Sequence, residues 1–103
     1  MAFNLKHKFG AKPTVIDEKR FASQKEARYY QALKQRQATG EILFFLMQVP
    51  FCLAGGVKYR LDFLEFHSDG SVHCIDVKGF RTQTYILKKK QVEDLYPVTI
   101  EEV

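Results

Sequence analysis

Three residues in the middle of the chain combine the groups that phosphodiester hydrolysis requires. Asp62 lies in one predicted strand, and Asp76 and Lys78 lie in the next, after a Ser-Asp-Gly turn at 68–70. Side chains two positions apart in a strand leave the same face, so Asp76 and Lys78 lie together. Two carboxylates suit a hard divalent cation, and an ammonium beside them can orient water and neutralise developing charge. The pattern predicts a site for a divalent metal and a phosphodiester, provided that the register brings Asp62 to the same place.

The length of the turn decides whether Asp62 faces Asp76. A two-residue turn sends the two carboxylates to opposite faces of the hairpin. A three-residue loop, with Gly70 in the left-handed conformation of a G1 bulge, pairs Asp62 directly with Asp76. That register also sets apolar residues opposite one another and places Glu65 opposite His73. We therefore expect the three-residue loop.

Composition and charge describe one small domain with a basic surface. The 103 residues suffice for a single core, and 46% hydrophobic residues with nine Phe and five Tyr indicate a packed globule. Residues 1–40 carry nine Lys or Arg against three Asp or Glu. We expect one domain with a basic N-terminal segment, 1–20, and a core, 21–103. The positive charge fits a phosphate-facing surface, and it equally fits solvated helix faces.

Neither the cysteines nor the apolar segments point to another class of protein. Cys52 and Cys74 have no metal-type spacing, and the three histidines add none, so we expect reduced cysteines and no zinc site. The apolar run 42–47 is too short to span a bilayer, and no signal peptide is visible. We expect a cytoplasmic protein with no membrane partner.

Helix and turn signals divide the chain into elements in the order αβββαβ. Ser23-x-x-Glu26 is typical of a helix start, and Gly40 of a helix end. The apolar run that follows is typical of a strand covered on both faces, and Pro50 is expected to end it. The expected elements are a short extended piece at 14–16, a helix at 23–38, strands at 42–49, 57–67 and 71–78, a helix from Thr82 or Thr84 to Leu95, and a strand at 98–103.

Six different short blocks follow one another along nearly the whole chain in a recognisable order and spacing. They are Lys8-Phe9-Gly10, Phe21–Ala27 with Tyr30 and Leu33, Gly40–Ile42, Gln48–Phe51, Tyr59–Phe63, and Asp76–Thr82 followed by Lys88–Lys90. With the order of elements, these blocks resemble the PD-(D/E)XK nuclease superfamily. More narrowly, they resemble a family of small phage-encoded proteins, catalogued as a domain of unknown function and presumed to be endonucleases. The resemblance implies an α+β, restriction-endonuclease-like αβββαβ core, in which two helices flank a mixed sheet.

The resemblance also implies roles for the acidic residues and the lysine. Asp62 and Asp76, with the backbone carbonyl of Val77, would hold Mg²⁺ or Mn²⁺, and Lys78 would orient or deprotonate the attacking water. A helix glutamate completes the metal site in the related nucleases, which assigns that role to Glu26.

Each assignment has a structural alternative. Asp62, Asp76 and Lys78 could form an ion-pair cluster that only fixes the hairpin. Glu26 could bond back to the Ser23 amide in a capping box. Against that alternative, Glu26 lies on the helix stripe that is expected to pack inward.

Polar and basic residues around these acids are candidates for contact with nucleic acid. Gln48 could bond metal waters or a phosphate, or it could mark the end of burial. Arg60 shares a strand face with Asp62. The candidate phosphate-binding residues are Gln48, Arg60, Arg81, Thr82, Lys88 and Gln91. Tyr29, Tyr30 and Tyr85 could stack on bases, although aromatic residues at helical spacing more often belong to the core.

The expected function is that of a metal-dependent DNA endonuclease, selective for branched DNA such as a Holliday junction. We expect it to act as a homodimer in a phage or mobile-element pathway inside the bacterial host. Two alternatives stay open: a non-catalytic nucleic-acid-binding module, and a nuclease subunit of a larger complex.

Overall fold

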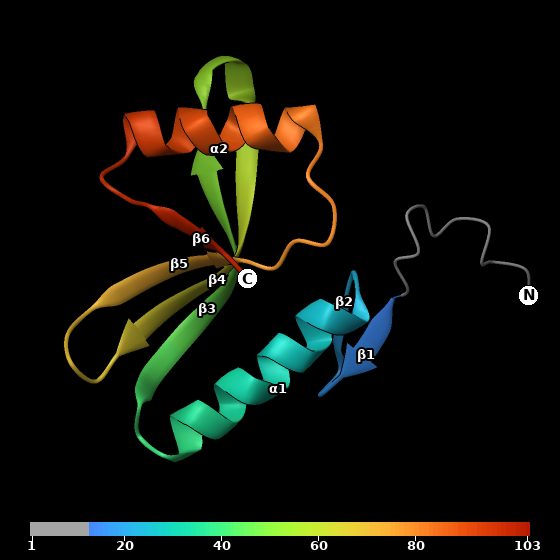
Figure 1. Cartoon of the computed structure of the whole chain (residues 1–103), viewed down its shortest axis with the longest axis vertical. Coiled ribbons are helices and arrows are strands. Elements are labelled where there is room, and N and C mark those ends of the chain that lie inside the picture. Colours follow the sequence, from blue (N-terminus) through green and yellow to red (C-terminus); the bar gives the residue numbers. More distant parts are fainter. Residues whose placement is uncertain (1–12) are drawn as a thin grey trace, which may run out of the picture.

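The computed structural model describes residues 13–103, so the Lys8-Phe9-Gly10 block and most of the predicted basic segment lie outside the described residues (Figure 1). The elements are β1 (Thr14–Ile16), β2 (Lys19–Phe21), α1 (Gln24–Ala38), β3 (Ile42–Cys52), the 3₁₀ turn η3 (Ala54–Gly56), β4 (Lys58–His67), β5 (Val72–Asp76), α2 (Gln83–Leu95) and β6 (Ile100–Glu102). After the small β1–β2 hairpin, the order is αβββαβ, and the protein is of the mixed α+β class, as predicted.

Both helices begin at the capping residues that the sequence indicates. The Ser23 hydroxyl accepts a hydrogen bond of 3.1 Å from the Glu26 amide, and the Thr82 hydroxyl accepts one of 3.0 Å from the Tyr85 amide. Gly40 follows α1 with a φ of +89°, which a residue with a side chain rarely adopts. Of the two candidate starts for the second helix, Thr82 is therefore the one used.

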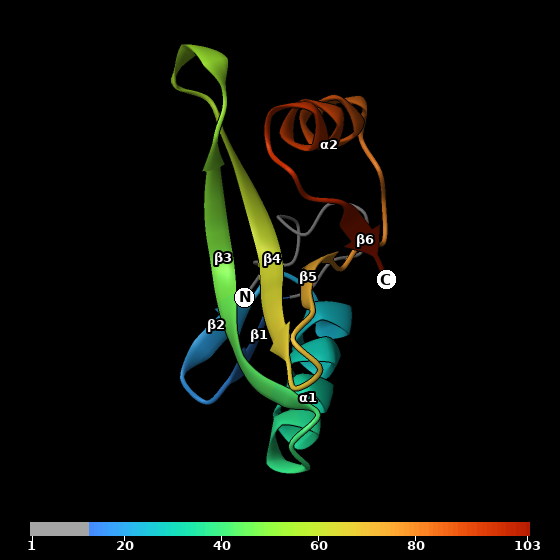
Figure 2. The ribbon, with the colours of Figure 1, turned by 90° about the vertical axis from the view of Figure 1, so that its left-hand side faces the viewer.

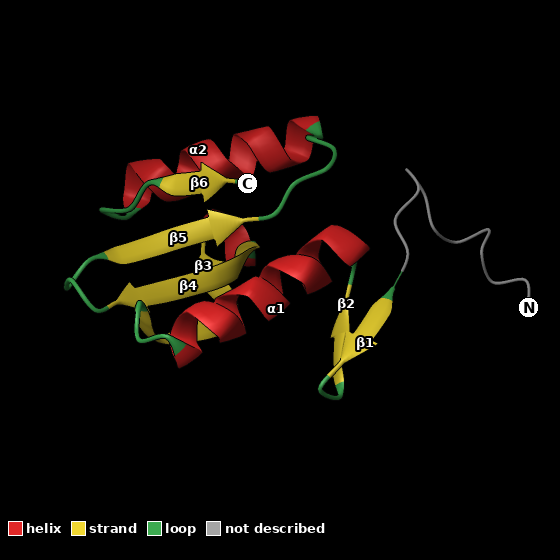
Figure 3. Cartoon of the chain, turned by 60° about the horizontal axis from the view of Figure 1, so that its bottom comes forward, coloured by secondary structure: helices red, strands yellow, loops and turns green. Residues whose placement is uncertain are grey.

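Four strands form one mixed sheet in the order β3-β4-β5-β6. β3, β4 and β5 are antiparallel neighbours, and β6 lies parallel to β5 because α2 carries the chain back along the sheet. Figure 3 shows the strands between the two helices. Among the described residues no helix is long and apolar enough to cross a membrane.

Each helix covers its own face of the sheet. Neighbouring β5 residues point to opposite faces, and Cys74 packs in the cluster with Val92 of α2, while Ile75 packs in the cluster with α1. The α1 cluster comprises Phe21, Ala27, Tyr30, Leu33, Ile42, Phe63, Ile75 and Val77. The α2 cluster comprises Leu53, Tyr59, Leu61, Cys74, Val92 and Ile100.

The β4–β5 hairpin has the three-residue loop that we expected. The His67 amide donates to the Ser71 carbonyl at 2.9 Å, and Gly70 has a φ of +90°. The ladder pairs Phe63 with Ile75 and Glu65 with His73, which is the predicted register. β5 ends at Asp76, two residues earlier than predicted.

The predictions for β3 were wrong in two respects. The strand continues through Pro50 to Cys52, and its outer side is not covered: Leu43 is 60% exposed, and Phe44 and Leu46 are also exposed. β3 is an edge strand, with β4 as its neighbour on one side (Figure 2). A proline lacks the N–H that a second neighbour would need, so it is tolerated at an edge and does not end the strand.

Candidate active site

The two aspartates meet at the place where the β4–β5 ladder ends. Beyond the Phe63–Ile75 pair, the Asp62 amide donates to Asp76 Oδ1 at 3.0 Å, and the Val77 amide donates to Asp62 Oδ2 at 2.9 Å. Each carboxylate thus accepts a hydrogen bond that a backbone carbonyl would accept in a regular ladder. The ladder ends one residue short of the predicted Asp62–Asp76 pair, and the two hydrogen bonds bring both carboxylates together between the ends of the strands.

Asp76 is fully buried, with 0% of its surface exposed. Its Oδ2 atom has no hydrogen-bond partner among residues 13–103. Burial raises the pKa of the Asp76 carboxyl, and burial likewise raises the pKa of Asp62; in both cases the Lys78 charge opposes the effect. A buried carboxylate oxygen without a partner is costly, which favours a cation, an ordered water or a closer approach of the neighbouring Tyr85 hydroxyl at this position.

Glu26 faces the same region from α1. It is 6% exposed, and the Gln48 side-chain amide donates to its Oε2 at 3.3 Å. Burial, and then the nearby Asp62 charge, raise the pKa of Glu26 to about 7. The prediction that Glu26 points inward is confirmed, and its carboxylate lies beside Gln48 while the Ser23 hydroxyl caps the Glu26 amide.

Gln48 links the two sides of the site. Its side-chain amide also lies 3.5 Å from Asp62 Oδ1, so one side chain joins the α1 glutamate to the β4 aspartate. Its backbone φ is +54°, in the left-handed region, and the β3–β4 register skips this residue. Such a conformation costs about 1–3 kcal/mol in a residue other than glycine, and strain of this kind gathers at functional sites.

Lys78 places its charge near all three acids. That charge lowers the pKa of Glu26, Asp62 and Asp76, against the effect of burial. Within the described part of the chain, Lys78 forms no ion pair, and its Nζ lies 4.4 Å from the centre of the Tyr85 ring. The alternative in which Asp62, Asp76 and Lys78 form an ion-pair cluster requires a direct contact between the ammonium and a carboxylate, and the described residues show none.

The donor set suits a hard cation that keeps water ligands. In residues 13–103 no three Asp, Glu, His or Cys side chains stand close enough to hold a metal by themselves. Asp62 and Asp76 supply a pair of carboxylates. The side-chain amide of Gln48 lies between Asp62 and the carboxylate of Glu26. Mg²⁺ is held in proteins by one or two carboxylates plus waters, so this arrangement fits Mg²⁺ or Mn²⁺. Val77 contributes its amide to the site, and the role of its carbonyl stays a prediction.

The predicted phosphate-binding residues are more scattered than the acids. Arg81 pairs with Glu102 at 3.2 Å, and Lys88 Nζ donates to the Lys58 carbonyl at 3.4 Å. Thr82 caps α2, while Arg60 on β4 and Gln91 on α2 are exposed. Of the six candidates, the contacts bring Gln48 alone against the acids in the described residues.

Sequence reasoning missed Glu102. Parallel pairing of β6 with β5 sets Glu102 beside Asp76, and Glu102 binds Arg81 and Lys89, the latter at 2.9 Å. The sequence carries no signal for this contact, because β6 reaches Asp76 only after α2 has returned the chain to the sheet.

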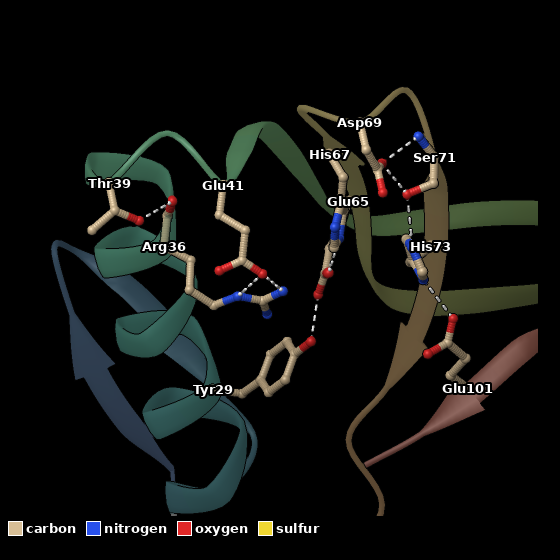
Figure 4. Close-up of polar contacts among 10 residues, drawn as sticks. All are labelled: Tyr29, Arg36, Thr39, Glu41, Glu65, His67, Asp69, Ser71, His73 and Glu101. Atoms are coloured by element: carbon tan, nitrogen blue, oxygen red, sulfur yellow. Dashed lines mark hydrogen bonds and ion pairs between the residues drawn. The ribbon is translucent and has the colours of Figure 1, made fainter.

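A second group of titratable side chains lies toward the hairpin turn (Figure 4). Buried Glu65 accepts a hydrogen bond from the Tyr29 hydroxyl and lies 2.9 Å from His67 Nε2. Glu65 is opposite His73 in the ladder, but its partner is His67, which shares its strand face. His73 binds Glu101 at 2.8 Å instead, and the centres of the two histidine rings lie 4.2 Å apart, with the ring planes tilted by 35°.

Comparison with known proteins identifies one relationship. A family model described as "Protein of unknown function (DUF1064)" matches residues 6–101. No curated protein and no solved structure gives a significant match.

Proposed function

Since the chain belongs to the DUF1064 family, whose description assigns no activity, we propose from the site that it is a divalent-metal-dependent DNA endonuclease. The observation that carries the proposal is the pair of carboxylates formed by buried Asp76 and half-buried Asp62. Near them lies the Lys78 ammonium, which no carboxylate of residues 13–103 binds. The αβββαβ order supports the further proposal that the fold is the restriction-endonuclease-like core of PD-(D/E)XK nucleases.

The acids would hold the cation, and Lys78 would donate hydrogen bonds to the attacking water or to the phosphate. Asp62, Asp76 and the Val77 carbonyl would bind Mg²⁺ or Mn²⁺, with Glu26 reaching the ion through a water ligand. When bound, the ion supplies positive charge for the phosphate and makes a water more acidic. The ammonium of Lys78 could donate to the attacking water or to a phosphate oxygen while the P–O bond to water forms and the P–O bond to the leaving sugar oxygen breaks. Gln48 would keep Glu26 and Asp62 in place during this step.

The surface supports binding through phosphates rather than through bases. The two helices of the described chain pack on opposite faces of the sheet, so they do not pair with each other as a helix-turn-helix does. Exposed Arg60 and Gln91, with Lys88, are candidates for phosphate contacts, which position DNA without reading its sequence. We therefore propose selectivity for branched DNA, such as a junction in a phage or mobile-element pathway. We also propose a homodimer, which would present one active site to each of two DNA strands. A measurement of the oligomeric state in solution tests this.

Cleavage of a labelled four-way junction and of the matched linear duplex in Mg²⁺ tests this proposal. Wild type should cut the junction faster than the duplex, and Asp76→Asn should lose at least about 100-fold in rate. Asp94→Asn, which changes an exposed acid of α2, is the matched control and should cut like wild type.

Two results would contradict the proposal. Equal rates on junction and duplex would remove the selectivity for branched DNA. If wild type binds the junction in Ca²⁺ but never cuts it in Mg²⁺ or Mn²⁺, the protein is a binding module or a subunit that needs a partner.

A further inference from the structure

The ammonium of Lys78 is held by an aromatic ring. Its backbone is fixed at both ends: the Lys78 amide donates to the Val103 carbonyl at 3.2 Å, and its carbonyl accepts from Lys25 Nζ at 3.0 Å. Its Nζ lies 4.4 Å from the centre of the Tyr85 ring, within the range of a cation–π contact. Among the described residues no carboxylate lies within ion-pair distance of that nitrogen.

A ring and a carboxylate hold a cation in different ways. A carboxylate accepts one or two of the three ammonium protons, and those protons are then not available to another acceptor. The face of a ring attracts the charge as a whole and leaves N–H groups free on the other side. Lys78 can therefore be held in place while it keeps donors for a water or a phosphate oxygen.

Tyr85 is itself fixed in position. It is the third residue of α2, and its amide is bound by the Thr82 hydroxyl that caps the helix. Its ring lies 6.2 Å from the Tyr59 ring, between α2 and β4. The capping contact thus determines where the ring stands, and the ring determines where the ammonium stands.

The hydroxyl end of Tyr85 reaches toward the acids. Burial, and then the charges of Asp76 and Glu102, raise the pKa of this hydroxyl. The Tyr85 hydroxyl and Asp76 Oδ2 are both buried, and neither lies within hydrogen-bond distance of a partner in residues 13–103. The hydroxyl is still close enough to Asp76 to lower the pKa of that carboxyl, against the effect of burial. The two ends of one side chain therefore lie beside the two groups, Lys78 and Asp76, that the proposed reaction needs.

We propose that Tyr85 is a positioning residue, whose ring holds the Lys78 ammonium at the active site and leaves its protons free for the reacting groups. The inference rests on the proposed function for its consequence in catalysis. The contact itself is a property of the metal-free protein and can be tested without any cleavage.

The first test is the NMR signal of the Lys78 ε-methylene in metal-free protein, assigned by its loss in Lys78→Arg. A methylene held over a ring is shifted upfield by the ring current. Wild type and Tyr85→Phe, which keeps the ring, should show that shift. In Tyr85→Leu the signal should move to the position of exposed lysines, and a signal that does not move would overturn the proposal.

The second test is single-turnover cleavage of the junction in Mg²⁺, with binding measured separately in Ca²⁺. Tyr85→Leu should cut about tenfold more slowly or worse, with unchanged binding, because a misplaced group lowers rate without lowering affinity. Tyr85→Phe should stay near wild type.

Tyr96→Leu is the matched control, because it removes a ring from the other end of α2, where Tyr96 packs on Phe51 at 5.2 Å. Equal losses in Tyr85→Leu and Tyr96→Leu would indicate a general packing effect and contradict the proposal. If wild type cuts nothing, the proposed function fails, and the NMR result still decides whether Tyr85 holds Lys78.

Discussion

At the scale of single residues, burial of acids makes stability depend on pH. The Glu26 pKa is about 7 in the folded protein against 4.5 for the free side chain. Between these values the folded state keeps a proton that the unfolded state has lost, so stability falls as pH rises from about 4.5 to about 7. The effect amounts to about 3 kcal/mol at most.

Glu26→Gln should remove this dependence. In urea unfolding with EDTA, wild type should lose more stability between pH 5 and pH 8 than Glu26→Gln does, because the amide carries no charge to bury. Glu18→Gln, an exposed change in the β1–β2 turn, should follow wild type. The same pH dependence in wild type and Glu26→Gln would show that Glu26 is not the group responsible.

We expect Asp76 to lower the stability of the metal-free protein and to be required for cation binding. Asp76→Asn removes a buried charge and keeps an oxygen for the Asp62 amide, so the metal-free protein should gain about 1 kcal/mol. Mg²⁺ should raise the melting temperature of wild type at pH 8, because an ion that binds only the folded state stabilises it. It should leave Asp76→Asn unchanged, and equal stabilisation of both proteins would place the cation elsewhere. Thermal melts with EDTA and with Mg²⁺ measure both effects.

At the scale of elements, α1 is joined to the β4–β5 hairpin by a buried polar contact. The Tyr29 hydroxyl of α1 donates to Glu65, which is buried on β4 and also meets His67. Figure 4 shows the contact beside the hairpin turn, and its printed partners do not include Glu26, Asp62 or Asp76, so we expect it to act in the assembly of the fold.

Tyr29→Phe should cost about 1–3 kcal/mol, because it leaves a buried carboxylate oxygen without its donor. Tyr96→Phe is the matched control: it also removes one hydroxyl, from an exposed hydrogen bond to the Cys52 carbonyl, and should cost less. Urea unfolding at one pH compares the two. A larger loss in Tyr96→Phe would mean that the Glu65 contact does not hold α1 to the sheet.

At the scale of the whole molecule, charge determines how DNA is held. If binding is through phosphates, junction affinity in Ca²⁺ should fall linearly with the logarithm of salt concentration. Arg60→Ala should reduce the slope by about 1, because one phosphate contact is lost. Arg28→Ala, which changes an exposed arginine on α1 away from its buried stripe, should leave the slope unchanged. Equal slopes for wild type and Arg60→Ala would show that Arg60 does not contact a DNA phosphate.

Features that depend on neighbouring residues were predictable from the sequence. The caps Ser23 and Thr82 each act on an amide three residues ahead. Gly70 permits the three-residue loop, and that loop sets the register that brings the Asp62 amide to the Asp76 carboxylate just beyond the last ladder pair. These are short-range effects of turn and capping chemistry, so residue types and spacing were enough to determine the order of elements and the central pair of acids.

Features that depend on distant segments were decided only by the tertiary structure. Strand order left β3 at the edge of the sheet, so its apolar run is exposed on one side and Pro50 does not end it. Packing of α2 placed Tyr85 under the Lys78 ammonium, and the left-handed backbone at Gln48 turned its amide toward Glu26. Local sequence specifies which groups are present and how each hairpin and helix forms. Burial, pKa and contacts between elements arise only when the elements pack, because each depends on groups that the chain brings together from far apart.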